Sequence, residues 1–269
     1  MILYRTEDGA RVEMADGVYA PADSAWDDLL KAENLAEVLR QADEPAERGT
    51  TLSPVTVEEV WAAGVTYYRS RTARMDESKE SGGSSFYDKV YQAERPELFM
   101  KATPHRVVGH GQPLKLREDS NWMVPEPELT LWLSPAGAIR GYTIGNDLSS
   151  RDIEGENPLY LPQAKTFDGC ASIGPGILIQ EEPMAKETAI ELTIFRDGES
   201  VFSGSTQLSQ MKQTLENIVA YLFRAASFPQ GCFLMTGTGI VPPDDFTLKS
   251  GDRVDISIEG IGTLSNPVE

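Results

Sequence analysis

The sequence predicts a protein of mixed α and β structure, with a large strand-rich body behind a small N-terminal piece. From about residue 54 onward, short runs of β-branched and aromatic residues alternate with Gly and Pro, which is typical of strands joined by turns. Residues 1–41 instead combine strand-like and helix-like runs. A chain of 269 residues is long enough for one large domain and a small appendage. We therefore expect a small domain over 1–57 and a main domain over 58–269.

The N-terminal piece is expected to contain short strands followed by two helices. The strands cover 2–5 and 11–14, and the helices cover 24–32 and 34–41. Ser24 and Asn34 stand at the helix starts as candidate N-caps, because their side-chain oxygens can accept a free backbone N–H. A polar stretch follows and is interpreted as a linker.

Three elements of the body have clear patterns. Ala189 to Phe195 and Ser200 to Ser203 flank Asp197-Gly198, which predicts a hairpin. Apolar residues between Leu208 and Leu222 recur at helical spacing, which predicts an amphipathic helix. Residues 252–262 return to strand character.

The composition excludes several classes of protein. A net charge of −18 disfavours binding to nucleic acid or to an anionic membrane. No apolar run reaches the roughly 18 residues of a membrane-spanning helix, and the N-terminus lacks the pattern of a signal peptide. Cys170 and Cys232 are the only cysteines, which fits a reducing compartment. We expect a cytoplasmic protein.

Two glutamates point to a metal site. Glu126 and Glu128 stand two residues apart at the start of an alternating, strand-like run, so both carboxylates project from the same face. Like charges so close repel unless a cation neutralises them, and hard divalent cations prefer oxygen ligands. A predicted turn at residues 135–137 and a second strand-like run would bring Asp147 back beside them. The alternative interpretation is an acidic rim on an edge strand.

Several separate segments resemble the fumarylacetoacetate hydrolase superfamily, and together they cover the chain in order from about residue 58. They are Ala63–Tyr67, Leu98–Lys101, Pro125–Leu129, Gly141–Asp152, Ala164–Asp168, Ile173–Pro175 and Ile258–Asn266. The resemblance implies an α+β fold built on a rolled mixed β-sheet, in a homodimer or homotetramer. It also implies a Mg²⁺ site, or a Mn²⁺ or Ca²⁺ site, formed by Glu126, Glu128 and Asp147.

A subgroup is more similar still. Residues 93–99 and 150–165 resemble the 2-keto-3-deoxy-D-arabinonate dehydratases. The resemblance implies a hydro-lyase that takes water from a 2-keto-3-deoxy sugar acid, a small 2-oxo acid, to give 2-oxoglutarate semialdehyde. It implies that Lys165 lies near the developing negative charge and that Glu97 is the base, or the partner of a water that acts as base. Arg151 would hold Asp147 or contact substrate, and Thr238 would contact substrate.

Residues 69–90 are rich in Arg, Ser and Gly and are expected to form a lid, in which Arg69 suits an anionic substrate. Carbon–carbon hydrolases of the superfamily use a His–Glu dyad, often on a lid helix. His105 and His110, the two histidines here, both lie outside that stretch. Their position disfavours a metal-dependent hydrolase of a 2,4-diketo acid or acylpyruvate, which is kept as the alternative. A metal-binding fold without catalysis is a third reading, which the complete Glu, Glu, Asp and Lys set disfavours.

Overall fold

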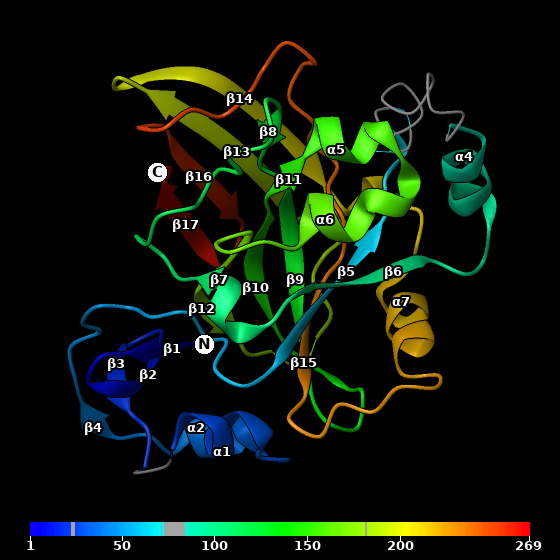
Figure 1. Ribbon diagram of the computed structural model, residues 1–269. Coiled ribbons are helices and arrows are strands. Elements are labelled where there is room, and N and C mark those ends of the chain that lie inside the picture. Colours follow the sequence, from blue (N-terminus) through cyan, green and yellow to red (C-terminus); the bar gives the residue numbers. More distant parts are fainter. Residues whose placement is uncertain (23–24, 71, 73–83, 181) are drawn as a thin grey trace.

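The computed structural model describes residues 1–22, 25–70, 72, 84–180 and 182–269. Over these residues the strands form one large sheet, one four-stranded sheet and one two-stranded pair, and the helices are short (Figure 1). The large sheet is mixed, because β15 pairs with β5 in parallel and with β9 in antiparallel orientation. The predicted α+β class with a mixed sheet is confirmed.

The large sheet runs in the order β4-β3-β2-β1-β12-β10-β9-β15-β5-β6, and the short strand β7 also pairs with β12. Its strands are β1 (Ile2–Thr6), β2 (Gly9–Met14), β3 (Gly17–Ala20), β4 (Glu44–Pro45), β5 (Glu59–Gly64), β6 (Glu97–Ala102), β7 (Val107–Val108), β9 (Pro127–Leu133), β10 (Ile139–Asp147), β12 (Ala171–Leu178) and β15 (Cys232–Met235). The central strands β9 and β10 form the hairpin that the sequence predicts.

The N-terminal strands extend this sheet, since β1 pairs with β12 through Ile2 opposite Leu178. The helices α1 (Trp26–Lys31) and α2 (Leu35–Arg40) follow, as expected. Asn34 precedes α2, but its side chain makes no capping hydrogen bond, and Ser24 lies outside the described residues. The division at residue 57 stays a prediction.

The four-stranded sheet has the order β14-β13-β16-β17. Its strands are β13 (Ala189–Arg196), β14 (Glu199–Gln207), β16 (Arg253–Ile258) and β17 (Gly262–Pro267), and the predicted hairpin is β13 with β14. Figure 1 shows this sheet beside β9 and β10, with α1 and α2 at the opposite end of the molecule.

The predicted helix between Leu208 and Leu222 is wrong in its first half, because α7 covers only Leu215–Leu222. Met211 has an extended backbone and bridges to Tyr67, a pairing that a helix could not make. Thr214 then caps α7 by accepting the Asn217 N–H at 3.2 Å. A long-range contact therefore overrides the local helical pattern.

Alternation along β9 separates two cores. Leu129, Leu131 and Leu133 pack toward the four-stranded sheet, while Trp132 faces the core that includes α1 and α2. Glu128 has the same parity as Trp132 and so projects from the second face. The β9 strand is buried along its whole length. Its rigidity fixes where the acidic side chains stand.

The remaining elements are α4 (Ser84–Gln92), α5 (Arg151–Glu156), α6 (Leu161–Lys165) and the pair β8 (Met123–Val124) with β11 (Ser149–Ser150). Of these, α5 and α6 lie near the end of β9 where Glu128 stands. In Figure 1, α5 and α6 lie together above this end of the sheet. They carry basic residues toward it.

Leu131→Ala should lower the free energy of unfolding by about 3 kcal/mol, because it leaves a cavity in the centre of the sheet. Leu131 is fully buried, whereas Val201 on β14 is well exposed. Val201→Ala should therefore change stability by less than about 0.5 kcal/mol. Urea unfolding of both variants checks this, and equal losses would contradict the assignment of β9 to the core.

Candidate metal centre and active site

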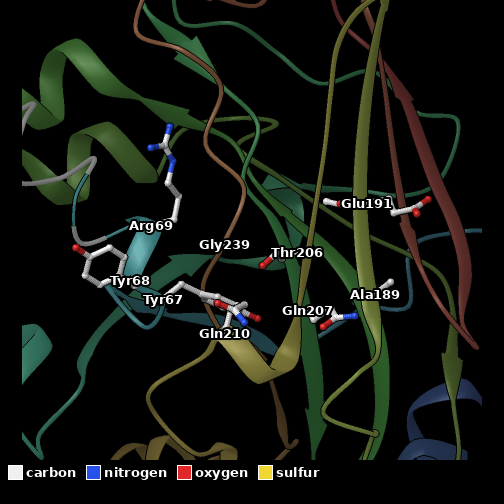
Figure 2. Close-up of a pocket in the computed structure, with 10 residues that line it drawn as sticks. Tyr67, Tyr68, Arg69, Ala189, Glu191, Thr206, Gln207, Gln210 and Gly239 are labelled. Carbon is white, nitrogen blue, oxygen red and sulfur yellow. The ribbon is translucent and has the colours of Figure 1, made fainter.

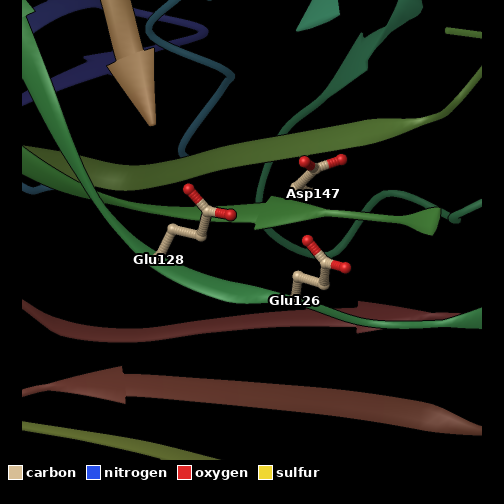
Figure 3. Close-up of side chains that lie close together, drawn as sticks. All are labelled: Glu126, Glu128 and Asp147. Carbon is tan, nitrogen blue, oxygen red and sulfur yellow. The ribbon is translucent and has the colours of Figure 1, made fainter. Parts of the chain in front are cut away.

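Three carboxylates converge at the ends of β9 and β10. Glu126 immediately precedes β9, Glu128 lies within it, and Asp147 is the last residue of β10. The hairpin register places Gly145 opposite Glu128, and the Asp147 N–H donates to the Glu126 carbonyl at 2.9 Å. One oxygen from each carboxylate lies within 4.8 Å of the others, and Figure 3 shows the three groups around a common space. The sequence-predicted triad is thus brought together.

The three groups are almost completely buried, with exposures of 4%, 2% and 1%. Burial is the largest cause that raises the pKa of Glu128 well above its usual value, and the charges of Asp147 and Glu126 add to it. Such a cluster of acceptor-only oxygens suits a hard divalent cation. The cavity between them measures about 10 Å³, room for an ion or a single water rather than a substrate.

Gly237 orients one of these carboxylates from the far side. Its N–H donates to Oε2 of Glu128 at 2.5 Å. The backbone has φ of 96°, in the region that favours Gly, and a Cβ there would collide with the Thr66 hydroxyl. The next residue, Thr238, lines the cavity and donates its hydroxyl to the Ile240 carbonyl at 3.2 Å.

Lys165 lines the same cavity. Its Nζ donates to Glu126 Oε2 at 2.7 Å, to Asp147 Oδ2 at 3.0 Å and to Ser149 Oγ at 2.7 Å. Lys165 is the last residue of α6. Pro162 near the start of α6 and the turn before it favour the helix. The ammonium group is fully satisfied by three acceptors.

Arg151 begins α5 and is also buried. Its Nη2 lies 2.8 Å from Glu126 Oε1. It therefore holds Glu126, whereas the sequence suggested Asp147 or the substrate as its partner. The reason is that α5 starts beside β8, where the Arg151 N–H donates to the Trp122 carbonyl at 2.8 Å.

Lys101 on β6 was missed by the sequence reasoning. Its Nζ lies 2.6 Å from Asp147 Oδ1, and it is completely buried. The one available signal was a lysine placed two residues after Phe99 in an otherwise apolar run, on the face of β6 that also carries Glu97. Glu97 is partly exposed and its carboxylate lies against Gly64, a residue that lines the acidic cavity.

Arg69 does not reach this cavity. It lies on a separate cleft of about 470 Å³ (Figure 2). Gly239 lines the same cleft and directly follows Thr238, which lines the acidic cavity. Most of the predicted lid over 69–90, namely 71 and 73–83, lies outside the described residues.

Comparison with known proteins decides the family. The family model described as fumarylacetoacetate hydrolase, C-terminal, matches residues 68–269. The chain belongs to this family. Two curated relatives are similar over 80% of the chain and 73% of their own length. A probable 2-keto-3-deoxyxylonate dehydratase of Haloferax volcanii is 50% identical, and the 2-dehydro-3-deoxy-D-arabinonate dehydratase of Saccharolobus solfataricus is 45% identical.

Solved structures of this family superpose on the whole chain. One is 2-keto-3-deoxy-D-arabinonate dehydratase complexed with magnesium and 2,5-dioxopentanoate. It is 36% identical, with a TM-score of 0.83, and the match covers 100% of this chain and 99% of that one. The expected fumarylacetoacetate hydrolase type of fold is therefore confirmed. In the described part of the chain, no helix is long and apolar enough to cross a membrane.

The raised pKa of Glu128 predicts how the metal-free protein responds to pH. A folded-state pKa above the unfolded one gives stability at low pH that is lost as the pH rises through the folded pKa. We expect metal-free wild type to be less stable at about pH 8 than at about pH 5, and Glu128→Gln to lose less over that interval. Urea unfolding in EDTA measures it. Exposed Glu199→Gln is the control, and identical pH profiles for wild type and Glu128→Gln would refute the expectation.

Proposed function

We propose that this protein is a Mg²⁺-dependent dehydratase of a 2-keto-3-deoxy sugar acid, a hydro-lyase of sugar-acid breakdown. The substrate class is a 2-keto-3-deoxy-pentonate, and the product is 2-oxoglutarate semialdehyde, which is 2,5-dioxopentanoate. The observation that carries the proposal is the buried triad of Glu126, Glu128 and Asp147 beside Lys165, in a chain 50% and 45% identical to two such dehydratases.

Glu126, Glu128 and Asp147 would hold the Mg²⁺. The bound ion would polarise the 2-oxo group and thereby make the C3 protons more acidic. The small acidic cavity requires the rest of the substrate to extend out of it. The donor set fits Mn²⁺ and Ca²⁺ as well, since all three cations accept carboxylate oxygens.

The chain's own residues supply the remaining chemistry. Glu97 is proposed to take a proton from C3, directly or through a water, and the C4 hydroxyl then leaves as water. Its position against Gly64 supports this, because Gly64 lines the cavity. Lys165 uses its three donors on Glu126, Asp147 and Ser149, so it would stabilise the negative charge that develops on the substrate through its own positive charge in the cavity that it lines. Migration of the new double bond toward C5 gives the aldehyde, so no external oxidant is needed.

Three residues are proposed to bind or orient the substrate. Thr238 lines the cavity, and Arg69 lies on the neighbouring cleft, where it can attract an anion. Arg151 acts through Glu126, which it contacts at 2.8 Å. The positive charges of Arg69 and Arg151 make the approach of an acidic substrate to this site more favourable, against a protein net charge of −18.

We also propose a cytoplasmic homodimer or homotetramer. The two buried, unpaired cysteines fit a reducing compartment. Size-exclusion chromatography with light scattering tests the oligomeric state, and a monomeric mass would overturn that part.

The function is tested by mass-spectrometric product analysis. Purified protein is incubated with 2-keto-3-deoxy-pentonates and hexonates, a 2,4-diketo acid and an acylpyruvate, with Mg²⁺ or with EDTA. We expect a pentonate to lose about 18 mass units, the mass of one water, when Mg²⁺ is present and not when EDTA is present. Pyruvate release from a diketo acid or an acylpyruvate would instead identify the hydrolase. His110 lies on a different cavity, beside Tyr4 and Arg48, which argues against that outcome.

Lys165→Met should lower turnover by about a hundredfold or more, since a buried, preorganised positive charge beside a developing anion is worth ~3 kcal/mol. Exposed Lys186→Met is the matched control and should retain wild-type turnover. Steady-state kinetics measures both. Because Lys165 acts by charge, borohydride with substrate should trap no adduct, and a trapped adduct at Lys165 would contradict this role.

A further inference from the structure

A second buried lysine stands behind the acidic cavity. Lys101 projects from β6, and its side chain is fully buried. Its Nζ lies 2.6 Å from Asp147 Oδ1 and donates to the Leu148 carbonyl at 2.9 Å. It also donates to the Lys165 carbonyl. One ammonium group thus joins three separate elements: β6, the end of β10 and the end of α6.

The cost of burying the positive charge of Lys101 must be compensated by its partners. A buried charge is costly unless it is paired and hydrogen-bonded, and an ammonium group has three donors. Lys101 donates to two carbonyls and forms an ion pair with one carboxylate, so its charge is compensated within the protein.

The two oxygens of Asp147 are divided between two lysines. Oδ1 meets Lys101, and Oδ2 accepts from Lys165 at 3.0 Å. Lys165 and Asp147 line the acidic cavity, whereas Lys101 is not among the described residues that line it. Lys101 thus contacts Asp147 without lining the cavity, and this contact limits the rotation of the Asp147 carboxylate.

The carbonyl contact extends this control to Lys165. That residue ends α6, where the last carbonyls of a helix have no partner within the helix. The Lys101 ammonium donates a hydrogen bond to the Lys165 carbonyl and so supplies the missing partner. It fixes the backbone from which the cavity-lining Lys165 side chain extends.

We infer that Lys101 is a positioning residue, which sets both the metal-binding orientation of Asp147 and the placement of Lys165. The inference rests on the proposed metal site, but not on the identity of the substrate. Groups that orient metal ligands from behind typically affect metal affinity by 10–100-fold.

Charge alone predicts the opposite sign. Removing a cation 2.6 Å from Asp147 would make the site more negative and would tighten the binding of a divalent cation. Positioning predicts weaker binding, because Oδ1 loses its partner and Asp147 becomes free to rotate. A metal titration therefore separates the two accounts.

The test is a titration of the metal-free Lys101→Met variant with Mn²⁺ in the absence of substrate. Electron paramagnetic resonance measures the Mn²⁺ binding. We expect the Kd to rise by about 10–100-fold. Arg196→Met is the matched control, because it also removes a cation from a buried aspartate, Asp252, at 2.7 Å, but in the four-stranded sheet. Its Mn²⁺ affinity should equal that of wild type.

Turnover at saturating Mn²⁺ provides the second readout. If Lys101 also positions Lys165, kcat stays at least tenfold low when the metal site is full, whereas control of Asp147 alone would let kcat recover. Unchanged or tighter Mn²⁺ binding by folded Lys101→Met overturns the inference. Full recovery of kcat at saturating Mn²⁺ overturns the part of the inference that concerns the placement of Lys165. If Lys101→Met does not fold, Lys101→Gln, which keeps a hydrogen-bond donor, takes its place. Metal binding without the predicted product would refute the dehydratase but leave Lys101 its role.

Discussion

Three carboxylates are buried within 4.8 Å of one another at the ends of two adjacent strands, and like charges at that separation repel strongly. The neighbouring structure answers this repulsion with Lys165, Arg151 and Lys101, each nearly or completely buried. These cations pair with Glu126 and Asp147, and a divalent cation would also meet Glu128, which has no ion-pair partner among the described residues. Ion pairs of this kind add little net stability but are costly to break, so they hold a definite geometry.

That geometry depends on the sheet. Strand β9 is buried along its whole length between β10 and β15, and packed cores cover both of its faces. A strand so fixed cannot turn its alternate side chains away. The carboxylates therefore remain together despite their repulsion, and the energy for this comes from apolar burial far from the metal site.

The three cations belong to elements outside the β9–β10 hairpin that carries the carboxylates. Arg151 opens α5, Lys165 closes α6 and Lys101 belongs to β6, so three elements must dock correctly before the site is balanced. Each cation contacts a different subset of oxygens: Arg151 binds Glu126, Lys101 binds Asp147, and Lys165 bridges both. The arrangement leaves Glu128 with a backbone donor, Gly237, rather than a cation within ion-pair distance among the described residues. Burial, together with the charges of Asp147 and Glu126, therefore raises the pKa of Glu128 well above its usual value.

The sequence by itself indicated the triad, because strand alternation and a short turn are local properties, but an acidic rim on an edge strand stayed the alternative until the family resemblance favoured a metal site. Glu126 and Glu128 share a face through a period of two residues, and a tight turn returns Asp147 to them. The family resemblance added Lys165 and the type of fold. Only the tertiary structure decided which cation meets which carboxylate: Arg151 binds Glu126, and Lys101, whose burial no local pattern reveals, binds Asp147. The same limit explains the helix predicted from Leu208, which the pairing of Met211 with Tyr67 replaces. Burial and long-range pairing depend on segments distant in the chain, and a local pattern cannot report them.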